Sequence, residues 1–475
     1  MAGANFHASI LSISRPLFLG LSAAVLFAAA SELAAQLPSE TTVKIDEIAA
    51  KALADSGAPS VSIAIVQGGK VAYEKAYGKA RLDPTVDAKA EMRYSIGSVS
   101  KQLLAGAVLL LVQDGKLSLD DRVSRYLPNL TRAGEITIRQ LLSHTSGYQD
   151  YYPQDYVAPF MEKPVTAESI LDQWARKPLD FEPGTRWQYS NTNYVVAGRI
   201  VERVTGGPFF AFLAKRILQP LGMTSAIDLS EHTLGPADAA GYTRFAQGPP
   251  RPAQAEGRGW LYAAGELAMT AHDLALWDIS LMEHTLLKPA SLELMTTPVR
   301  LRNGTPTNYA LGVAVSDAGG HPKLAHGGAV SGFVSLNTVW PDQGTAVVVL
   351  VNEDGSSAPE SITGQIAPLL LTEAEDPQAE RALQQARQIF DGLLEGKIDR
   401  SPLTPNADAY FTRQVLEDAS ASLKAMGPPE SLSQTSVELR GGMTYRHFKI
   451  KFKDKSLPLS TLTVPGGKLE QYLIQ

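Results

Sequence analysis

The chain has 475 residues, of which 44% are hydrophobic and 19% charged, and its formal net charge at pH 7 is -6. This length and composition are typical of a soluble globular protein of two or three domains. Because Lys and Arg are not in excess, the sequence argues against a nucleic-acid partner. Cysteine is absent, which excludes disulfides, thiolate metal sites and cysteine nucleophiles.

The first 35 residues have the layout of a secretory signal peptide. Arg15 precedes an apolar run from Leu17 to Ala30, and small residues follow it. We expect cleavage after Ala30 or Ala35, which would make the mature protein periplasmic or secreted. An uncleaved anchor is the alternative, although ~14 apolar residues are short for ~30 Å of hydrocarbon. We expect no stable membrane span after cleavage.

The region after the signal predicts a helix followed by a hairpin. Residues 41–55 place apolar side chains three and four positions apart, as an amphipathic helix does. Residues 60–78 alternate β-branched and small residues about Gly68-Gly69, which predicts a β-hairpin. From residue 98 to about 300 the pattern is mostly helical, with long polar loops.

Strand-like runs return late in the chain. They are residues 309–315, 332–340 and 345–352, followed by a helix at about 361–371. Strands at both ends with helices between them predict an α+β fold. We expect one antiparallel sheet flanked by helices, with a mostly helical insertion.

The remaining residues predict a separate small domain. Residues 372–380 are acidic and polar, as a linker is. A helical pattern stops at Gly396, and residues 447–452, 456–464 and 468–474 alternate as strands do. We therefore divide the chain into a signal peptide (1–35), a large domain (36–373) and a C-terminal α+β domain (381–475).

One Ser-x-x-Lys occurs in the chain, from Ser98 to Lys101, at the front of an apolar helix. On a helix these two side chains share a face, roughly 5–6 Å apart at Cβ. A lysine held away from water loses its proton readily, so Lys101 could act as a base beside the Ser98 hydroxyl. The alternative is that Ser98 caps the helix and Lys101 reaches the surface.

Two further short patterns bear on this choice. Tyr189-Ser190-Asn191 precedes an apolar helix, and His326-Gly327-Gly328 precedes a strand. A phenol can relay a proton, an amide can hold a substrate carbonyl, and paired glycines let a substrate lie along a strand edge. Taken singly, a core tyrosine, a loop histidine and a turn explain them as well.

Taken together and in this order, the three patterns resemble those of the penicillin-recognising serine hydrolases. This group includes class C β-lactamases, D,D-carboxypeptidases, D-aminopeptidases and related esterases. The resemblance extends from about residue 40 to 371, with further similar stretches at residues 115–128, 137–147, 181–191 and 263–277. It implies a serine β-lactamase-like fold for residues 36–373.

The resemblance also implies a mechanism. Ser98 would attack a carbonyl and form an acyl-enzyme, with Lys101 and Tyr189 sharing the proton transfers. Which of the two is the base stays open. Asn191 would hold both the substrate amide and Lys101.

The strand edge at the third pattern would bind the substrate. The backbone N–H groups of Ser98 and Ala329 would hold the oxyanion, and His326, Gly327 and Gly328 would line the edge. No cofactor is implied, and no metal-ligand spacing occurs. His144 is expected to be structural.

The chain departs from the family pattern at two places, and the first of them bears on the substrate. Class C β-lactamases carry Lys-Thr-Gly where this chain has His326-Gly327-Gly328, so a permanent cation and a hydroxyl are missing. We therefore favour hydrolysis of small esters, amides or D-amino-acid peptides. A β-lactamase or D,D-carboxypeptidase is one alternative, and a penicillin-binding or sensor protein without turnover is another. Many relatives have two glycines where this chain has Gly265-Glu266.

The C-terminal residues, 381–475, fall outside this resemblance. They resemble the cone-shaped α+β domains related to nuclear transport factor two, which often dimerise. We therefore expect two kinds of partner, a small-molecule or peptide substrate and a second copy bound through this domain. We assign no catalytic residue here.

Overall fold

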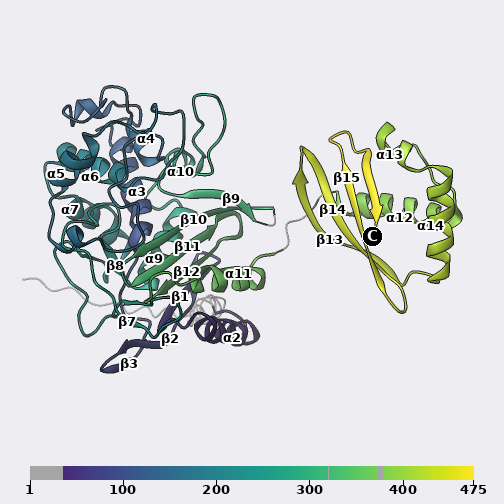
Figure 1. Ribbon diagram of the computed structural model, residues 1–475, viewed down its shortest axis with the longest axis horizontal. Coiled ribbons are helices and arrows are strands. Elements are labelled where there is room, and N and C mark those ends of the chain that lie inside the picture. Colours follow the sequence, from purple (N-terminus) through teal and green to yellow (C-terminus); the bar gives the residue numbers. More distant parts are fainter. Residues whose placement is uncertain (1–35, 319, 373–375, 377) are drawn as a thin grey trace, which may run out of the picture.

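The computed structural model describes residues 36–318, 320–372, 376 and 378–475 (Figure 1). The predicted signal peptide and residues 373–375 and 377 of the predicted linker lie outside these residues. Within the described part of the chain, no helix has both the length and the apolar character that crossing a membrane requires.

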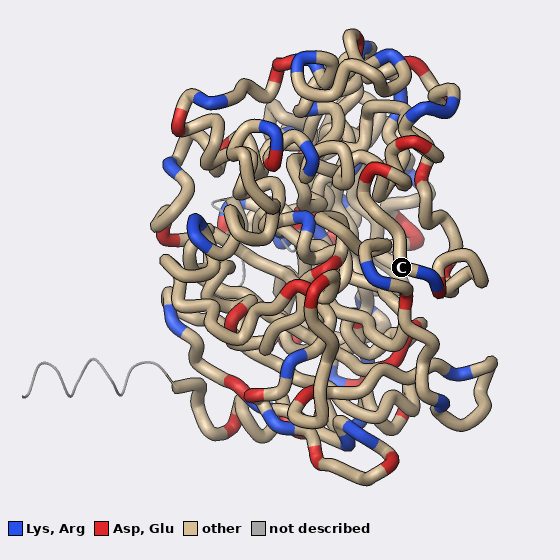
Figure 2. The backbone as a smooth tube through the Cα atoms, turned by 90° about the vertical axis from the view of Figure 1, so that its left-hand side faces the viewer, with Lys and Arg blue, Asp and Glu red and all other residues tan. Residues whose placement is uncertain are grey.

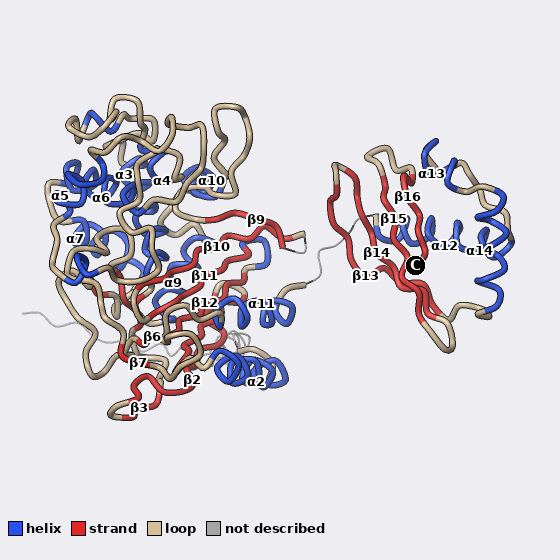
Figure 3. The backbone as a smooth tube through the Cα atoms, viewed as in Figure 1, coloured by secondary structure: helices blue, strands red, loops and turns tan. Residues whose placement is uncertain are grey.

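A seven-stranded antiparallel sheet forms the centre of the large domain (Figure 3). Its order is β3-β2-β1-β12-β11-β10-β9. The strands are β1 (Ser60–Gln67), β2 (Lys70–Leu82), β3 (Thr85–Asp87), β9 (Ala314–Ala318), β10 (His321–Val330), β11 (Phe333–Trp340) and β12 (Thr345–Val351). Ile63 of β1 lies opposite Val349 of β12, so the two ends of the domain build one sheet, as the sequence predicts.

Helices cover both faces of this sheet. On one face lie α2 (Ser39–Ser56) and α11 (Ala358–Leu370). Against the other lies α9 (Ala271–Met282), with the rest of the helical region beyond it (Figure 1). That region contains α3 (Ser100–Gln113), α4 (Ile138–Leu142), α5 (Ala167–Ile170), α6 (Asn191–Thr205), α7 (Phe209–Leu213), α8 (Gln219–Leu221) and α10 (Pro289–Thr296). The short strands are β4 (Tyr94–Ser95), β5 (Ile227–Asp228), β6 (Tyr242–Thr243), β7 (Arg251–Pro252) and β8 (Leu267–Met269).

Strand β1 shows why the sheet is covered twice. Ile63 and Ile65 pack into the core under α2 and α11, whereas Ala64 and Val66 pack into the core on the opposite side. Successive side chains on a strand point to opposite faces, so a run that is apolar at every position needs cover on both. Burying each large aliphatic side chain contributes roughly 1.5–3 kcal/mol.

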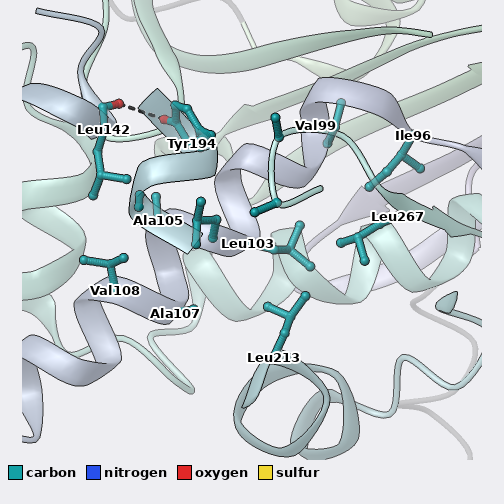
Figure 4. Packing of buried hydrophobic residues seen from close by; sticks show 14 of the residues in the cluster. Ile96, Val99, Leu103, Ala105, Ala107, Val108, Leu142, Tyr194, Leu213 and Leu267 are labelled. Atoms are coloured by element: carbon teal, nitrogen blue, oxygen red, sulfur yellow. Dashed lines mark hydrogen bonds between the residues drawn. The ribbon is translucent and has the colours of Figure 1, made fainter. Parts of the chain in front are cut away.

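Helix α3 runs through the interior of the helical region. Leu103, Ala107 and Val108 lie among buried residues from several elements (Figure 4). All residues from Ser100 to Leu111 are buried. A helix that is apolar on every side belongs in a core. Lys101, in its first turn, is therefore surrounded by protein.

The predicted strand at 309–315 is largely wrong. The chain turns there, with the Ala310 N–H bonded to the Val313 carbonyl, and strand β9 begins only at Ala314. Gly312 has a φ of 76°, and a Cβ on it would lie 2.7 Å from the Lys101 carbonyl oxygen. This close approach to α3 bends the chain, so the apolar residues pack without forming a ladder.

The C-terminal domain is a four-stranded antiparallel sheet with helices on one side (Figure 1). Its elements are α12 (Ala379–Glu395), α13 (Pro405–Tyr410), α14 (Arg413–Ala425), β13 (Ser431–Arg440), β14 (Met443–Lys451), β15 (Ser456–Thr463) and β16 (Leu469–Ile474). Its own core contains Phe390, Phe448 and Leu459. The helix that stops at Gly396 and the last three strands were predicted, but β13, α13 and α14 were not.

Charged residues are interspersed along the chain, as Figure 2 shows. Several ion pairs are local and exposed, such as Lys44 with Glu40 and Lys51 with Asp55. Such pairs contribute little to stability. Among the described residues, no group of three or more His, Asp or Glu side chains could hold a metal ion.

Candidate active site

Ser98 lies in a single 3₁₀ turn, Gly97–Val99, that leads into α3. The residues on either side of it are buried, whereas Ser98 itself is partly exposed. Gly97 has a φ of 50°, and a Cβ on it would lie 3.1 Å from the backbone nitrogen of Ala329. Glycine therefore allows the turn that carries Ser98 to press against strand β10.

Strand β10 presents an accessible edge beside Ser98. Strand β9 pairs with it only as far as Ala325, among the residues described. Beyond that point Gly327 and Ala329 are exposed. Gly328 faces inward, where a Cβ would lie 2.0 Å from the Ile96 carbonyl oxygen. The three predicted residues 327–329 therefore lie at the serine.

Lys101 makes three hydrogen bonds through its amine. Its Nζ lies 2.8 Å from Ser98 Oγ, 2.9 Å from Asn191 Oδ1 and 2.7 Å from the Ala264 carbonyl oxygen. The side chain is fully buried. The alternative in which Lys101 reaches the surface is therefore excluded.

Burial lowers the pKa of Lys101 from its ordinary value of 10.5 to about 7. The carboxylate of Asp150 opposes this shift, but all three hydrogen-bond partners of the amine are uncharged. A neutral amine has two N–H donors and one lone pair. Because Asn191 Oδ1 and the Ala264 carbonyl can only accept, the lone pair is left for the Ser98 hydroxyl.

Asn191 is held in place by Asp150. The Asn191 backbone N–H donates to Asp150 Oδ1 at 2.9 Å, and its side-chain amide donates to Oδ2 at 3.3 Å. This leaves the amide oxygen facing Lys101. Burial raises the pKa of Asp150, and the N–H groups of Tyr152 and Asn191 and the charge of Lys101 oppose that rise.

Tyr189 lies on the same side of the site, just before α6. Lys101 Nζ is 5.0 Å from the centre of its ring. Burial raises the pKa of the Tyr189 phenol well above its usual range, and the contact with the Ser98 side chain offsets only part of the rise. The phenol therefore stays protonated at physiological pH.

His144 packs against Tyr189, with their ring centres 4.2 Å apart. Its Nδ1 accepts the Ser190 backbone N–H at 3.1 Å. Burial lowers its pKa well below the ordinary value, so the ring is neutral. His144 therefore packs against Tyr189 and has the structural role that the sequence analysis expects.

His326 is brought to the site, but its ring is buried. Its Nε2 lies 2.8 Å from the Tyr309 hydroxyl, and its Nδ1 lies 2.6 Å from the Gly327 carbonyl oxygen. Burial and, to a smaller extent, the charge of Lys101 lower its pKa to about 3. His326 is therefore neutral at pH 7, and both ring nitrogens are engaged within the protein.

The sequence did not reveal three groups around this cluster. Asp150 lies in a loop, and no spacing pattern connects it with Asn191. Ala264 contributes a backbone carbonyl, which leaves no signature in a sequence. Tyr309 was placed in a predicted strand, although it packs over His326. Only the motif residues themselves had a detectable signal.

Comparison with protein-family models matches residues 45–369 to the family described as Beta-lactamase. Among curated proteins, penicillin-binding protein 4* of Bacillus subtilis strain 168 is 26% identical over 363 residues. The alignment covers 73% of this chain and 80% of that protein.

Two solved structures are also similar. The D-amino acid amidase from Ochrobactrum anthropi SV3, complexed with D-phenylalanine, is 25% identical with a TM-score of 0.61. The match covers 70% of this chain and 99% of the amidase. The octameric penicillin-binding protein homologue from Pyrococcus abyssi has a TM-score of 0.60 at 22% identity, covering 91% of this chain and 95% of its own.

Proposed function

Since the chain belongs to the beta-lactamase family, we propose that it hydrolyses its substrate through an acyl-enzyme formed on Ser98. One observation carries this proposal. The amine of Lys101 is fully buried, has a pKa of about 7 and lies 2.8 Å from the Ser98 hydroxyl oxygen. A base with a pKa near the working pH is the most effective proton acceptor.

In the first step, Ser98 Oγ attacks the substrate carbonyl carbon while its proton passes to the neutral amine of Lys101. The carbonyl π electrons move to oxygen, giving a tetrahedral oxyanion. We assign the role of base to Lys101 because its pKa is depressed, whereas that of Tyr189 is raised. This proposal favours one of the two alternatives that the sequence leaves open.

In the second step, the bond to the leaving group breaks, and the Tyr189 phenol gives that group a proton. Tyr189 then recovers a proton from Lys101, so the amine is neutral again. Water then attacks the acyl-enzyme with Lys101 as base, and the Ser98 oxygen leaves with the proton that the amine has taken from the water. The tyrosine and the lysine are thus a donor and an acceptor whose pKa values are far apart.

The oxyanion would be held by backbone N–H groups of Ser98 and Ala329. The close packing of Gly97 on Ala329 supports this assignment, because it brings the serine turn and the strand edge together. The extended edge at Gly327 would pair with the substrate backbone. Asn191 would bind the substrate amide through contacts that Asp150 orients.

We propose small esters, amides and D-amino-acid peptides as the substrate class. His326 supplies no positive charge for a free carboxylate, because its pKa is about 3. This argues against an efficient β-lactamase or D,D-carboxypeptidase. The similarity to a D-amino acid amidase also favours an amide substrate.

We further propose that residues 1–35 direct export, and that the C-terminal domain joins copies of the chain. The Pyrococcus relative is described as octameric, which supports assembly into oligomers. Cell fractionation of the full-length chain and light scattering of the mature protein test these two points. Protein retained with the cytoplasm would refute export, and a monomer would refute assembly.

A second candidate function is penicillin binding without turnover. It is favoured by the similarity to a curated penicillin-binding protein. Intact mass after exposure to benzylpenicillin separates the two. An adduct that persists indicates the binding protein, whereas an adduct that clears indicates the hydrolase.

The hydrolase is tested with three substrates: p-nitrophenyl butyrate, D-alanine p-nitroanilide and nitrocefin. We expect the wild-type protein to cleave the ester or the anilide and to turn nitrocefin over poorly. The Ser98→Ala variant should lose this activity, with its circular dichroism unchanged. Equal rates in the two proteins would remove Ser98 from the mechanism.

A further inference from the structure

Glu256 lies at the far end of the strand edge beside Ser98. Its Oε1 accepts the backbone N–H of Ser331 at 3.0 Å. Ser331 directly follows β10 and is two residues beyond Ala329, whose N–H we assign to the oxyanion. On an extended chain, the N–H groups of alternate residues point to the same side. The carboxylate of Glu256 therefore takes the next hydrogen-bonding position along the edge on which the substrate would lie.

Tyr152 holds the same carboxylate from the helical region. Its hydroxyl donates to Glu256 Oε1 at 2.9 Å. Its backbone N–H donates at 3.1 Å to Asp150 Oδ1, the oxygen that also accepts the Asn191 N–H. Glu256 thus connects the loop that orients Asn191 with the end of β10, and it lies across this end of the active site.

The second oxygen of this carboxylate is free. Oε1 takes both hydrogen bonds, and among the described residues Oε2 has neither a hydrogen-bond donor nor a cation as a partner. Oε2 is also not one of the buried polar atoms without a partner. Burial and the Glu256 carboxylate, with smaller effects of Asp354 and Asp155, raise the pKa of the Tyr152 phenol. The charges that act most strongly at this point are therefore all negative, and Oε2 is open to a cationic ligand.

The acyl part of a substrate is the part that would meet Glu256. In the proposed mechanism Tyr189 protonates the leaving group, and its ring packs against that of His326 with ring centres 6.3 Å apart. The leaving group therefore lies toward His326, and the acyl part runs the other way, from Ala329 toward Ser331. Alternate residues of a strand are about 7 Å apart, so one residue of acyl chain fills the distance.

We propose that Glu256 is a specificity residue, which binds the ammonium group of a substrate that has a single unblocked amino acid on its acyl side. Oε2 accepts a charge-assisted hydrogen bond from the ammonium, while Ser331 and Tyr152 hold the carboxylate in place. A longer acyl chain would collide with Glu256. This inference rests on the proposed function, because it takes Ser98 and Ala329 as the reacting positions. It narrows the substrate class to amides and peptides with a free amino terminus.

Two substrates of nearly equal shape test the charge. D-Alanine p-nitroanilide has an ammonium group where D-lactic acid p-nitroanilide has a hydroxyl. Glu256→Gln keeps an oxygen that accepts from Ser331 and Tyr152, but it has no charge. The ratio of the two kcat/KM values, ammonium over hydroxyl, should be lower in this variant by about tenfold or more, the effect of one charge-assisted hydrogen bond.

The matched control is Glu360→Gln. Glu360 is an exposed residue in the first turn of α11, on the opposite face of the sheet from α9. The substitution removes the same charge, so this variant should keep the wild-type ratio. An equal fall in both variants would mean that the net charge of the protein, and not Glu256, selects the substrate.

Two further measurements need only the wild-type protein, so they decide the matter even if the Gln variant does not fold. The ratio should fall as the pH rises through about 8, where the ammonium of the substrate loses its proton. The titration of Lys101 affects both substrates alike and cancels. Glycyl-D-alanine p-nitroanilide, with one more residue on its acyl side, should release p-nitroaniline more slowly than D-alanine p-nitroanilide.

A Glu256→Gln variant with the wild-type ratio would overturn the proposal, as would a ratio that does not change with pH or equal cleavage of the longer anilide. Binding separates this inference from the proposed hydrolase, because Ser98→Ala forms no acyl-enzyme. NMR titration should give a dissociation constant for D-alanine p-nitroanilide about tenfold higher in Ser98→Ala/Glu256→Gln than in Ser98→Ala. Equal constants, or no binding to either protein, would refute the role of Glu256 whatever the assays show for Ser98.

Discussion

Two buried cations, one in each domain, have opposite surroundings. Arg446 in the C-terminal sheet is 2% exposed and binds Asp376 with two hydrogen bonds, of 2.8 and 3.0 Å. This arginine holds the pKa of Asp376 below its usual range. Lys101 in the large domain is fully buried too, but its three partners are uncharged.

The difference separates a structural role from a chemical one. A buried charge with a well-placed counter-ion stays charged, and removing one partner is costly. A buried amine without such a partner gives up its proton. Arg446 is therefore an anchor for Asp376 in the predicted linker, whereas Lys101 is available to accept a proton from Ser98.

The largest expected effect is on activity, from Lys101→Met. Without the base, kcat/KM for p-nitrophenyl butyrate should fall by about 10³-fold, within the range that general base catalysis contributes. Stopped assays with the purified variant measure this loss. A variant that retains a tenth of the wild-type rate would show that Tyr189, or water, is the base.

Next in size is the effect of Arg446→Met on stability. This substitution leaves Asp376 buried without its counter-ion, so the free energy of unfolding should fall by about 3 kcal/mol or more. Urea denaturation of the full chain measures the loss. The Ser98 activity should be unchanged in the folded protein, and a matching Asp376→Asn substitution should recover part of the stability.

At low pH, Lys101→Met should raise the stability of the protein relative to the wild type, whereas Arg446→Met lowers it. The folded pKa of Lys101, about 7, lies below its ordinary value of 10.5. Since the folded state binds fewer protons between these values, wild-type stability falls as the pH is lowered from about 10 to 7 and then levels off. Lys101→Met removes that penalty.

The stability of Lys101→Met relative to the wild type should therefore improve by about 4 kcal/mol between pH 10 and pH 6. Denaturation curves of both proteins at the two pH values give this difference. A relative stability that does not change with pH would mean that the folded-state pKa of Lys101 is normal.

A smaller effect is expected from Asp150→Asn. The Asp150 carboxylate raises the pKa of Lys101 against the effect of burial. Its removal should move the acid limb of the kcat/KM profile to lower pH, by less than one unit. The asparagine still has an oxygen that accepts the Asn191 N–H, so a shift to higher pH would contradict this reasoning.

The smallest effect is expected at His321. This residue is intermediate between Arg446 and Lys101, because it has a carboxylate partner but can lose its proton. Its Nδ1 lies 2.6 Å from Asp342 Oδ2 and its Nε2 lies 2.9 Å from the Thr372 carbonyl oxygen. Both partners only accept, so the ring must carry two protons, and the Asp342 carboxylate raises its pKa. The stabilisation is complete below pH 6.5 and is lost as the pH rises through that raised pKa.

Replacing His321 with Asn should therefore lower the midpoint of thermal unfolding slightly at pH 6 and leave it unchanged at pH 9. Differential scanning calorimetry at the two pH values measures this. A loss of equal size at both pH values would show that the ring acts through packing alone.

The sequence predicted the part of the site that depends on local spacing. Ser98 and Lys101 share a helical turn, and the glycines before Ala329 were expected at a strand edge. The contacts that set the pKa of the Lys101 amine come from segments distant from Lys101 in the sequence. Asp150 and the Ala264 carbonyl reach the amine only through the tertiary fold, so no pattern of side chains could indicate them.

The errors in the fold have a similar origin. Residues 309–313 are as apolar as a strand, but the contact of Gly312 with α3 bends them, and this contact is not local. Strand β13 was missed because its side chains are mostly polar and exposed, so it lacks an alternating pattern. Hydrogen bonding to β14 makes it a strand.

The central claim is that the buried amine of Lys101 is a neutral base at physiological pH. The most direct test is a pH titration of its ¹³Cε NMR signal in the otherwise unmodified wild-type protein. We predict a single transition centred near pH 7. A signal that shows no change until the pH reaches the ordinary lysine range, near 10, would contradict the account.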